Sequence, residues 1–176
     1  MGLALLSSCS LLFRADQDLD AGPDAGLDGA DEQCQTRAGI ANLPGEFRAW
    51  LSTASDAPTL RFEHHDGPYT LVGGTMLAAN WDDLVDGALM HELSRTEFGA
   101  PLTVLPFVCG GGEVWTNTTI DGESASERDC DGWESKSSDF SSGAVGNVRT
   151  VDLQWTTADC GAVSCASRLP LYCFQQ

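Results

Sequence analysis

The sequence is poor in basic residues. It has 9 Lys and Arg against 26 Asp and Glu, a formal net charge of −17. Such a charge repels polyanions, so we expect no nucleic-acid partner and no direct attraction to an anionic lipid surface. The same charge also keeps a protein soluble without any ligand. Cationic partners and divalent cations remain compatible with this composition.

Several motifs typical of enzymes and metal proteins are missing. The sequence has no C-x-x-C pair and no Cys/His set with zinc-ligand spacing. It has no G-x-S-x-G motif, and Cys109–Glu113 lacks the Lys and Ser/Thr of a phosphate-binding loop. His64, His65 and Asp66 precede Gly67-Pro68, which indicates an exposed turn rather than an acid–base cluster. We therefore expect a protein without catalytic activity.

Long apolar runs are absent near the N-terminus, where residues 1–10 read MGLALLSSCS. This run is shorter than the roughly 20 residues of a transmembrane helix. Its end, Leu6-Ser7-Ser8-Cys9, resembles a bacterial lipobox, in which small residues precede a cysteine that is cleaved and lipidated. We expect residues 1–9 to be a signal remnant, with lipid chains on Cys9 as the contact with the membrane. A disordered apolar N-terminus with a spare thiol is the alternative.

Basic residues are also lacking before Cys9, whereas signal peptides normally begin with Lys or Arg. A translation start upstream of Met1 would explain this. Residues 16–32 carry seven acids and no base, interspersed with Gly, Ala and Pro. Such a segment buries too little apolar area to fold, so we predict an acidic disordered tether over residues 10–30.

The cysteine count is high and odd, with seven in 176 residues. Without zinc-type spacing, disulfides in an oxidising compartment are the best explanation. If Cys9 is lipidated, six cysteines remain for three disulfides, and six cysteines allow fifteen pairings. We expect an outer-membrane lipoprotein of the cell envelope, facing an oxidising compartment or secreted.

The folded part is expected over residues 31–176, with one helix near its start. Apolar Cys34, Ala38 and Ala41 have helical spacing, and Pro44-Gly45 is a stop signal. Residues 46–52 then alternate, with Phe47, Ala49 and Leu51 on one face and Arg48 and Trp50 on the other.

The remaining chain favours short strands joined by turns. We expect a strand, a Gly-Gly turn, a second apolar stretch and a loop or short helix over 68–87, and a strand at 114–116 after three glycines. Further strand candidates lie at 129–135, near 148–155, and at 169–174, where Leu169, Leu171 and Cys173 would share one buried face. With no internal repeat and no βαβ alternation, these elements predict an α+β domain of one or two helices and short antiparallel strands.

The cysteine arrangement and five sequence stretches resemble a known family. A Cys in the first helix, one in the last strand and one eight residues before it match the C-type lectin-like fold. The stretches LPGEFRAWLS, GPYTLVGGTMLAANWDDLVDG, VWTNTTIDG, DCDGWES and LYCFQQ resemble the endostatin-like domain of bacterial surface lipoproteins. This family includes leptospiral endostatin-like proteins and is largely of unknown function. Pro170 is a departure, because family members tend to carry Arg there, and it should occupy an edge or solvent-facing position.

The resemblance implies a disulfide arrangement with long stapled loops. Cys34 would pair with Cys173, and Cys130 with Cys165. Cys109 and Cys160 remain and would pair by default. The first bond would join the N-terminal helix to the last strand.

Calcium is the one cofactor that the sequence leaves open. Sugar-binding C-type lectins use a carboxylate-Pro-Asn/Asp loop and a Trp-Asn-Asp strand, and this chain has neither; residues 155–159 read WTTAD. An acidic loop offers other oxygen ligands, although such a loop is also explained by solvated carboxylates. The candidate calcium ligands are Asp121, Glu123, Glu127, Asp129 and Asp131.

Together these observations predict a surface-tethered, non-catalytic binding module. It would present its loops to an extracellular or envelope macromolecule, a protein or a polysaccharide. Some relatives bind host matrix or complement-regulating proteins, so the resemblance implies partners of that kind. The alternative is a structural envelope lipoprotein with no dedicated ligand.

Overall fold

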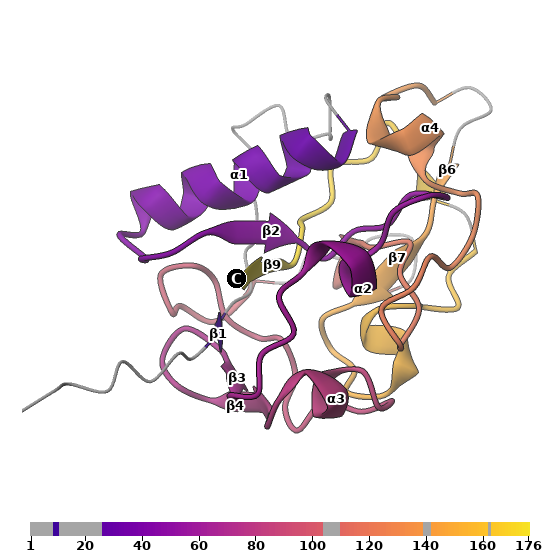
Figure 1. Ribbon diagram of the computed structural model, residues 1–176. Helices are drawn as coiled ribbons and strands as arrows, with labels where there is room; N and C mark the ends of the chain where they lie inside the picture. Colours follow the sequence, from indigo (N-terminus) through magenta and orange to yellow (C-terminus); the bar gives the residue numbers. More distant parts are fainter. Residues whose placement is uncertain (1–8, 11–25, 104–109, 139–141, 162) are drawn as a thin grey trace, which may run out of the picture.

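The computed structural model describes residues 9–10, 26–103, 110–138, 142–161 and 163–176. Within them the chain is an α+β protein with few helices and short, mostly antiparallel strands (Figure 1). The elements in chain order are β1 (Cys9–Ser10), α1 (Gly26–Ile40), β2 (Phe47–Ala49), α2 (Pro58–Arg61), β3 (Tyr69–Thr70), β4 (Met76–Ala78), α3 (Trp81–Leu84), β5 (Glu113–Trp115), α4 (Cys130–Trp133), β6 (Ser142–Gly143), β7 (Val145–Asn147), the 3₁₀ helix η1 (Leu153–Trp155), β8 (Val163–Ser164) and β9 (Cys173–Gln175).

The expected N-terminal helix is present, but it is longer at its start. It begins at Gly26 rather than near Asp31, and its buried stripe starts with Gly26 and Ala30. The predicted disordered tether over 10–30 is therefore wrong for its last residues. They are helical because Ala30 packs with Cys34 and Ala38 in one core, which outweighs the poor helix propensity of an Asp- and Gly-rich segment.

The end of α1 is set by a local backbone motif rather than by Pro44-Gly45. Asn42 has a left-handed φ of 55°. Its N–H donates to the Gly39 carbonyl at 3.1 Å, and the Leu43 N–H donates to the Ala38 carbonyl at 2.9 Å. These two bonds form a Schellman motif, in which Asn takes the position that Gly more often fills.

The two ends of the folded body meet in one sheet, because β2 pairs antiparallel with β9. Ala49 lies opposite Cys173, and Phe47 lies opposite Gln175. Just outside the strands, the Trp50 N–H donates to the Tyr172 carbonyl at 2.9 Å. Pro170 precedes β9, and its carbonyl accepts from the Trp115 N–H at 3.0 Å, so the missing proline amide disrupts no ladder bond of β9.

The buried side chains form two clusters, one on each side of β2 and β9. We call them the stapled core and the aromatic core. The stapled core comprises Ala30, Cys34, Ala38, Phe47, Ala49, Leu51, Trp115, Cys130, Trp133, Val145, Val163, Cys165, Leu169, Leu171 and Cys173. The aromatic core comprises Trp50, Phe62, Tyr69, Leu71, Leu77, Ala78, Trp81, Leu84, Leu89, Leu93, Val114, Val148, Trp155, Tyr172 and Phe174.

The alternation predicted for residues 46–52 and 169–174 explains the division between the two cores. Phe47, Ala49 and Leu51 enter the stapled core, while Trp50 enters the aromatic core. The last strand was expected to bury one face, but it buries both. Leu169, Leu171 and Cys173 join the stapled core, and Tyr172 and Phe174 join the aromatic core. The two strands therefore lie in the middle of the body.

The segment after α2 has the expected order of elements. The hairpin of β3 and β4 turns at Gly73 and Gly74, whose φ values of 105° and 88° suit glycine. It is followed by α3, which is capped by Asn80 through a 2.9 Å bond from the Asp83 N–H. β1 pairs parallel with β3, with Cys9 opposite Tyr69 and Ser10 opposite Thr70.

Two strand predictions in the second half are wrong. Residues 129–135 contain the short turn α4 rather than a strand, because Cys130, Asp131 and Trp133 all carry positive φ values near 60°. The strand expected near 148–155 is replaced by β7, which ends at Asn147, and by η1. β7 pairs with β5 and includes Gly146, where an added Cβ would lie 2.1 Å from the Trp155 carbonyl oxygen.

No helix in the described part of the chain has both the length and the apolar character needed to cross a membrane.

Candidate functional site

Two disulfides fix the framework that would carry a site. Cys34 of α1 is bonded to Cys173 of β9, 139 residues further on. Cys130 of α4 is bonded to Cys165, 35 residues further on. These are the two pairs that the family resemblance implied. Cys160 is disulfide-bonded as well, and Cys109 lies outside the described residues. Such bonds are typical of oxidising, non-cytoplasmic compartments.

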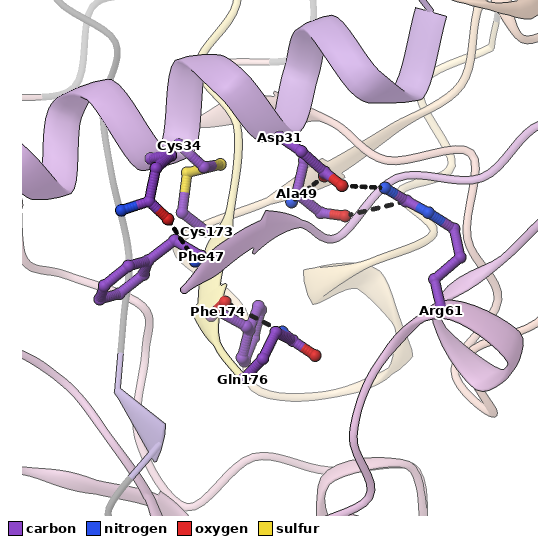
Figure 2. Close-up of a disulfide and its surroundings, with 9 residues drawn as sticks. Asp31, Cys34, Phe47, Ala49, Arg61, Cys173, Phe174 and Gln176 are labelled. Carbon is purple, nitrogen blue, oxygen red and sulfur yellow. Dashed lines mark hydrogen bonds and ion pairs between the residues drawn. A yellow bond between two sulfur atoms is a disulfide. The ribbon is translucent and has the colours of Figure 1, made fainter. Parts of the chain in front are cut away.

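A charged clamp next to the first disulfide joins α1 to the chain beyond β2 (Figure 2). The Arg61 guanidinium forms a 2.6 Å ion pair with the Asp31 carboxylate and donates to the Leu51 carbonyl at 3.1 Å. The other oxygen of Asp31 accepts from the Ala49 N–H at 2.9 Å. This contact orders the start of the folded body, so Asp31 and Arg61 are structural residues.

A buried network of hydroxyl groups begins at Thr116, the residue after β5. Ser52, Thr116, Thr118 and Thr156 are all fully buried. The Thr118 hydroxyl donates to the Thr116 carbonyl at 2.8 Å, so the Ser52 hydroxyl, 2.8 Å from it, must be the donor in that pair. The Thr156 hydroxyl donates to the Thr118 carbonyl at 2.8 Å and accepts from the indole N–H of Trp50 at 2.7 Å.

Asn117 connects this network to Ser126. It is fully buried with a left-handed φ of 47°. Its amide donates to the Ser126 carbonyl at 2.8 Å and accepts from the Ser126 hydroxyl at 2.7 Å. Every one of these hydroxyl protons is committed to a carbonyl or a neighbouring side chain, so the network stabilises the loops and offers no free nucleophile.

The acidic loop does not assemble the candidate calcium site. Asp129 turns inward, where its carboxylate caps α4 by accepting from the Gly132 N–H at 3.0 Å and accepts from the Ala54 N–H at 3.2 Å. Asp121 accepts from the Thr119 hydroxyl, and Glu123 from the Thr59 hydroxyl at 3.1 Å.

All five candidate calcium ligands belong to the described residues. Among those residues no three His, Cys, Asp or Glu side chains are grouped to hold a metal ion. Glu127 and Asp131 are exposed. The candidate ligand set is therefore corrected. Asp129 is used as a helix cap, and the other four carboxylates have hydroxyl or solvent contacts of their own.

The two adjacent histidines point to different neighbours. The His64 ring stacks on the Trp81 indole, with ring centroids 4.0 Å apart and an interplanar angle of 6°. His65 is half-buried and its backbone N–H donates to the Tyr69 hydroxyl at 3.4 Å. Its ring Nε2 lies 3.8 Å from a Glu63 oxygen. The pair therefore does not converge on one acid–base centre.

Tyr172 is a buried titratable group with a clear structural role. Its hydroxyl donates to the Trp155 carbonyl at 2.9 Å. Burial raises the pKa of Tyr172 well above its ordinary value of 10.0, because the phenolate would lose its hydration. The group stays protonated at neutral pH and supports the aromatic core.

Four exposed apolar side chains lie on segments that are joined by backbone bonds. Met76, Met90, Val151 and Leu153 are 41%, 50%, 39% and 56% exposed. The Met90 N–H donates to the Leu77 carbonyl at 2.9 Å, which places Met90 beside β4. We call this set the methionine surface.

A second bond connects the third segment to the other two. The Leu89 N–H donates to the Val151 carbonyl at 2.7 Å, so the 149–153 loop lies against residues 89 and 90. Leu77 and Leu89, which adjoin Met76 and Met90 in the chain, and Trp155, two residues after Leu153, all belong to the aromatic core. The segments of the methionine surface are therefore attached to the aromatic core through buried neighbouring residues. No sequence pattern pointed to it, because its three segments are far apart in the chain.

Comparison with protein-family models and with curated proteins gives no match for this chain.

Proposed function

We propose that this protein is a lipid-anchored, non-catalytic binding module of the cell envelope. In this proposal the body has a C-type lectin-like fold of the endostatin-like kind, and the methionine surface contacts an extracellular or envelope macromolecule. The observation that carries the proposal is the presence of four exposed apolar side chains on three segments that backbone hydrogen bonds join beside the aromatic core. Exposed apolar groups on neighbouring segments mark interaction sites more often than isolated ones do.

The fold part of the proposal is supported by the arrangement of the chain ends. The first long helix is bonded to the last strand by Cys34–Cys173, and that strand pairs with β2. The second disulfide, Cys130–Cys165, holds the loop region of the second half. An experimental structure compared with known C-type lectin-like domains tests this part.

The anchor part of the proposal has its own consequence. Cys9 pairs with Tyr69 across β1 and β3, and β3 pairs with β4, which carries Met76. Lipid on Cys9 would thus hold the β3–β4 side of the body near the membrane, where envelope proteins are the accessible partners. Mass spectrometry of membrane-extracted protein should find acyl mass on Cys9, and Cys9→Ser should release the protein. Unmodified Cys9 would contradict the anchor.

Binding can be tested on the full, disulfide-intact chain with two paired variants. Met90→Gln with Leu153→Gln alters the methionine surface. Ile40→Gln with Leu60→Gln alters two other exposed apolar residues, 54% and 75% exposed, on α1 and α2. Surface plasmon resonance against purified matrix proteins, envelope proteins and polysaccharides should show saturable binding that the first pair weakens and the second does not. Absence of any saturable ligand would favour a structural envelope component.

A further inference from the structure

We propose that the methionine surface binds a cationic amphipathic polypeptide segment, one that presents Lys or Arg side chains around a short apolar stripe. This inference rests on the proposed function and names the chemistry of the partner.

The surroundings of the methionine surface are acidic. Asp152 stands between Val151 and Leu153, and Asp86 and Glu92 flank Met90 in the chain; all three acids are exposed. Asp86 and Asp152 each accept a local backbone N–H, from Ala88 at 3.2 Å and Gln154 at 3.1 Å. These short-range bonds fix the carboxylates in place and leave oxygen lone pairs free for an incoming cation.

The acidic character extends over the whole segment that contributes Met76 and Met90. Residues 62–94 form β3, β4, α3 and their loops and contain no Lys or Arg. Arg149, which is exposed, precedes Val151 on the third segment. The acids in residues 62–94 are Glu63, Asp66, Asp82, Asp83, Asp86 and Glu92. The field at this side therefore favours a positively charged partner.

The side chains at the centre favour a polypeptide over a sugar or a lipid. Methionine thioethers adapt to irregular apolar side chains, and flexible Met-rich surfaces recur in sites that bind amphipathic helices. The four central side chains offer sugar hydroxyls neither a strong donor nor a strong acceptor. An anionic lipid surface would be repelled by the acids, whereas Lys or Arg next to an apolar stripe satisfies both the centre and its surroundings.

The probe is an amphipathic helical peptide of Lys and Leu, about 18 residues or five turns long. Matched peptides replace Lys by Glu or Leu by Ser. Fluorescence anisotropy with the full, disulfide-intact chain should show binding of the Lys/Leu peptide and at least tenfold weaker binding of both matched peptides. The affinity should fall as salt rises, because the charges are exposed.

Four double variants, two tests each with a control, separate the contribution of the methionine surface from that of the overall charge. Met90→Gln with Leu153→Gln should weaken peptide binding on the order of tenfold, and Ile40→Gln with Leu60→Gln should leave it unchanged. Asp86→Asn with Glu92→Gln should weaken it about threefold and flatten its salt dependence. Asp28→Asn with Glu32→Gln removes two exposed α1 charges as the control and should have a smaller effect. Thermal melting verifies that each variant is folded.

Each contrary result has a distinct meaning. Equal losses in the surface and control pairs, equal binding of the Glu/Leu peptide, or no binding of the Lys/Leu peptide would overturn the inference. Surface-dependent binding of a polysaccharide, or of neutral or anionic phospholipid vesicles, in place of the peptide would also overturn it. A surface-dependent polysaccharide would leave the proposed binding function intact. If no macromolecule binds through the surface at all, the proposed function fails as well.

Discussion

The stapled core and the aromatic core lie on opposite faces of the same two strands and are built from different side chains. The stapled core contains Cys34–Cys173 and Cys130–Cys165 and several small residues, such as Ala30, Ala38 and Ala49. The aromatic core contains neither of these disulfides. Its centre is Trp50, whose ring lies 5.0 to 6.0 Å from four other aromatic rings.

This difference shows two ways of stabilising a loop-rich chain. The stapled core combines a Trp115–Trp133 ring contact with three alanines, whose contacts bury little apolar area each, and it also contains two covalent bonds that restrict the unfolded chain. The aromatic core relies mainly on large rings, which bury much more area each. The methionine surface lies over the aromatic core, away from both of these disulfides, where local backbone bonds hold its segments.

The largest expected effect is the loss of the long disulfide. Cys34→Ala with Cys173→Ala opens a link that spans 139 residues and should lower the free energy of unfolding by about 5 kcal/mol. Cys130→Ala with Cys165→Ala opens a span of 35 residues and should cost about 4 kcal/mol. Urea denaturation of the oxidised proteins measures both values.

The same experiment tests whether the two cores are separate. Because β2 and β9 contribute to both cores, we expect a single transition and the same loss of stability by tryptophan fluorescence and circular dichroism. A variant that loses α1 helicity while its tryptophan signal remains native would show that the aromatic core folds without the staple.

The second largest effect should come from the other core. Trp50→Ala removes a fully buried ring and its bond to Thr156, and should lower the free energy of unfolding by about 4 kcal/mol. Trp50→Phe keeps most of the ring packing and should cost clearly less. Urea denaturation compares the two, and an equal loss in both would mean that the hydrogen bond, not the aromatic packing, dominates at this position.

The elements that could be predicted from sequence are those with local signals. The period-two pattern of Phe47, Ala49 and Leu51 identified a strand, and the paired glycines at 73 and 74 identified a hairpin turn. The same patterns could not show that both faces are buried around β2 and β9. An aromatic residue such as Trp50 or Tyr172 can face solvent or a second core, and its alternation with aliphatic residues is the same in both cases. The turn at Cys130 was missed because positive φ values at non-glycine residues leave no pattern in composition.

The residues of the candidate site depend on contacts between distant segments. Ser52 and Thr118 are 66 residues apart, and Trp50 and Thr156 are 106 apart, so the buried network had no sequence signal. The methionine surface is likewise formed by the bonds from Met90 to Leu77 and from Leu89 to Val151. The acidic loop had the composition of either a cation site or a solvated loop, and in the structure Asp129 serves as a cap.

A third, smaller effect concerns the charged clamp between Asp31 of α1 and Arg61 of α2. Arg61→Met should lower the free energy of unfolding by about 2 kcal/mol, because it leaves the half-buried Asp31 carboxylate without its cation. Asp31→Asn is the matched change. It retains an oxygen for the Ala49 N–H and removes only the charge, so it should cost about 1 kcal/mol. Urea denaturation measures both losses. A larger loss for Asp31→Asn would show that an unpaired Arg61 guanidinium costs more stability than an unpaired Asp31 carboxylate.

The smallest effect concerns Tyr172 of the aromatic core and includes a loss of stability in alkaline solution. The pKa of Tyr172 is raised above 10.0 by burial, so above that pH the unfolded chain releases a proton that the folded chain keeps. Stability from this group is complete below pH 10 and declines above it, by at most about 1.4 kcal/mol per pH unit.

Tyr172→Phe should remove that decline, while costing about 1 kcal/mol at neutral pH because the Trp155 carbonyl loses its donor. Tyr69→Phe retains Tyr172 and is the control that should keep the decline. Urea denaturation at neutral pH and above pH 10 gives the comparison. Because only proteins that retain Tyr172 lose this stability above pH 10, the free energies of unfolding of wild type and Tyr172→Phe should converge as the pH rises. Parallel curves would show that the phenol is not protected from water, and that the aromatic core is looser than its disulfide-bonded counterpart.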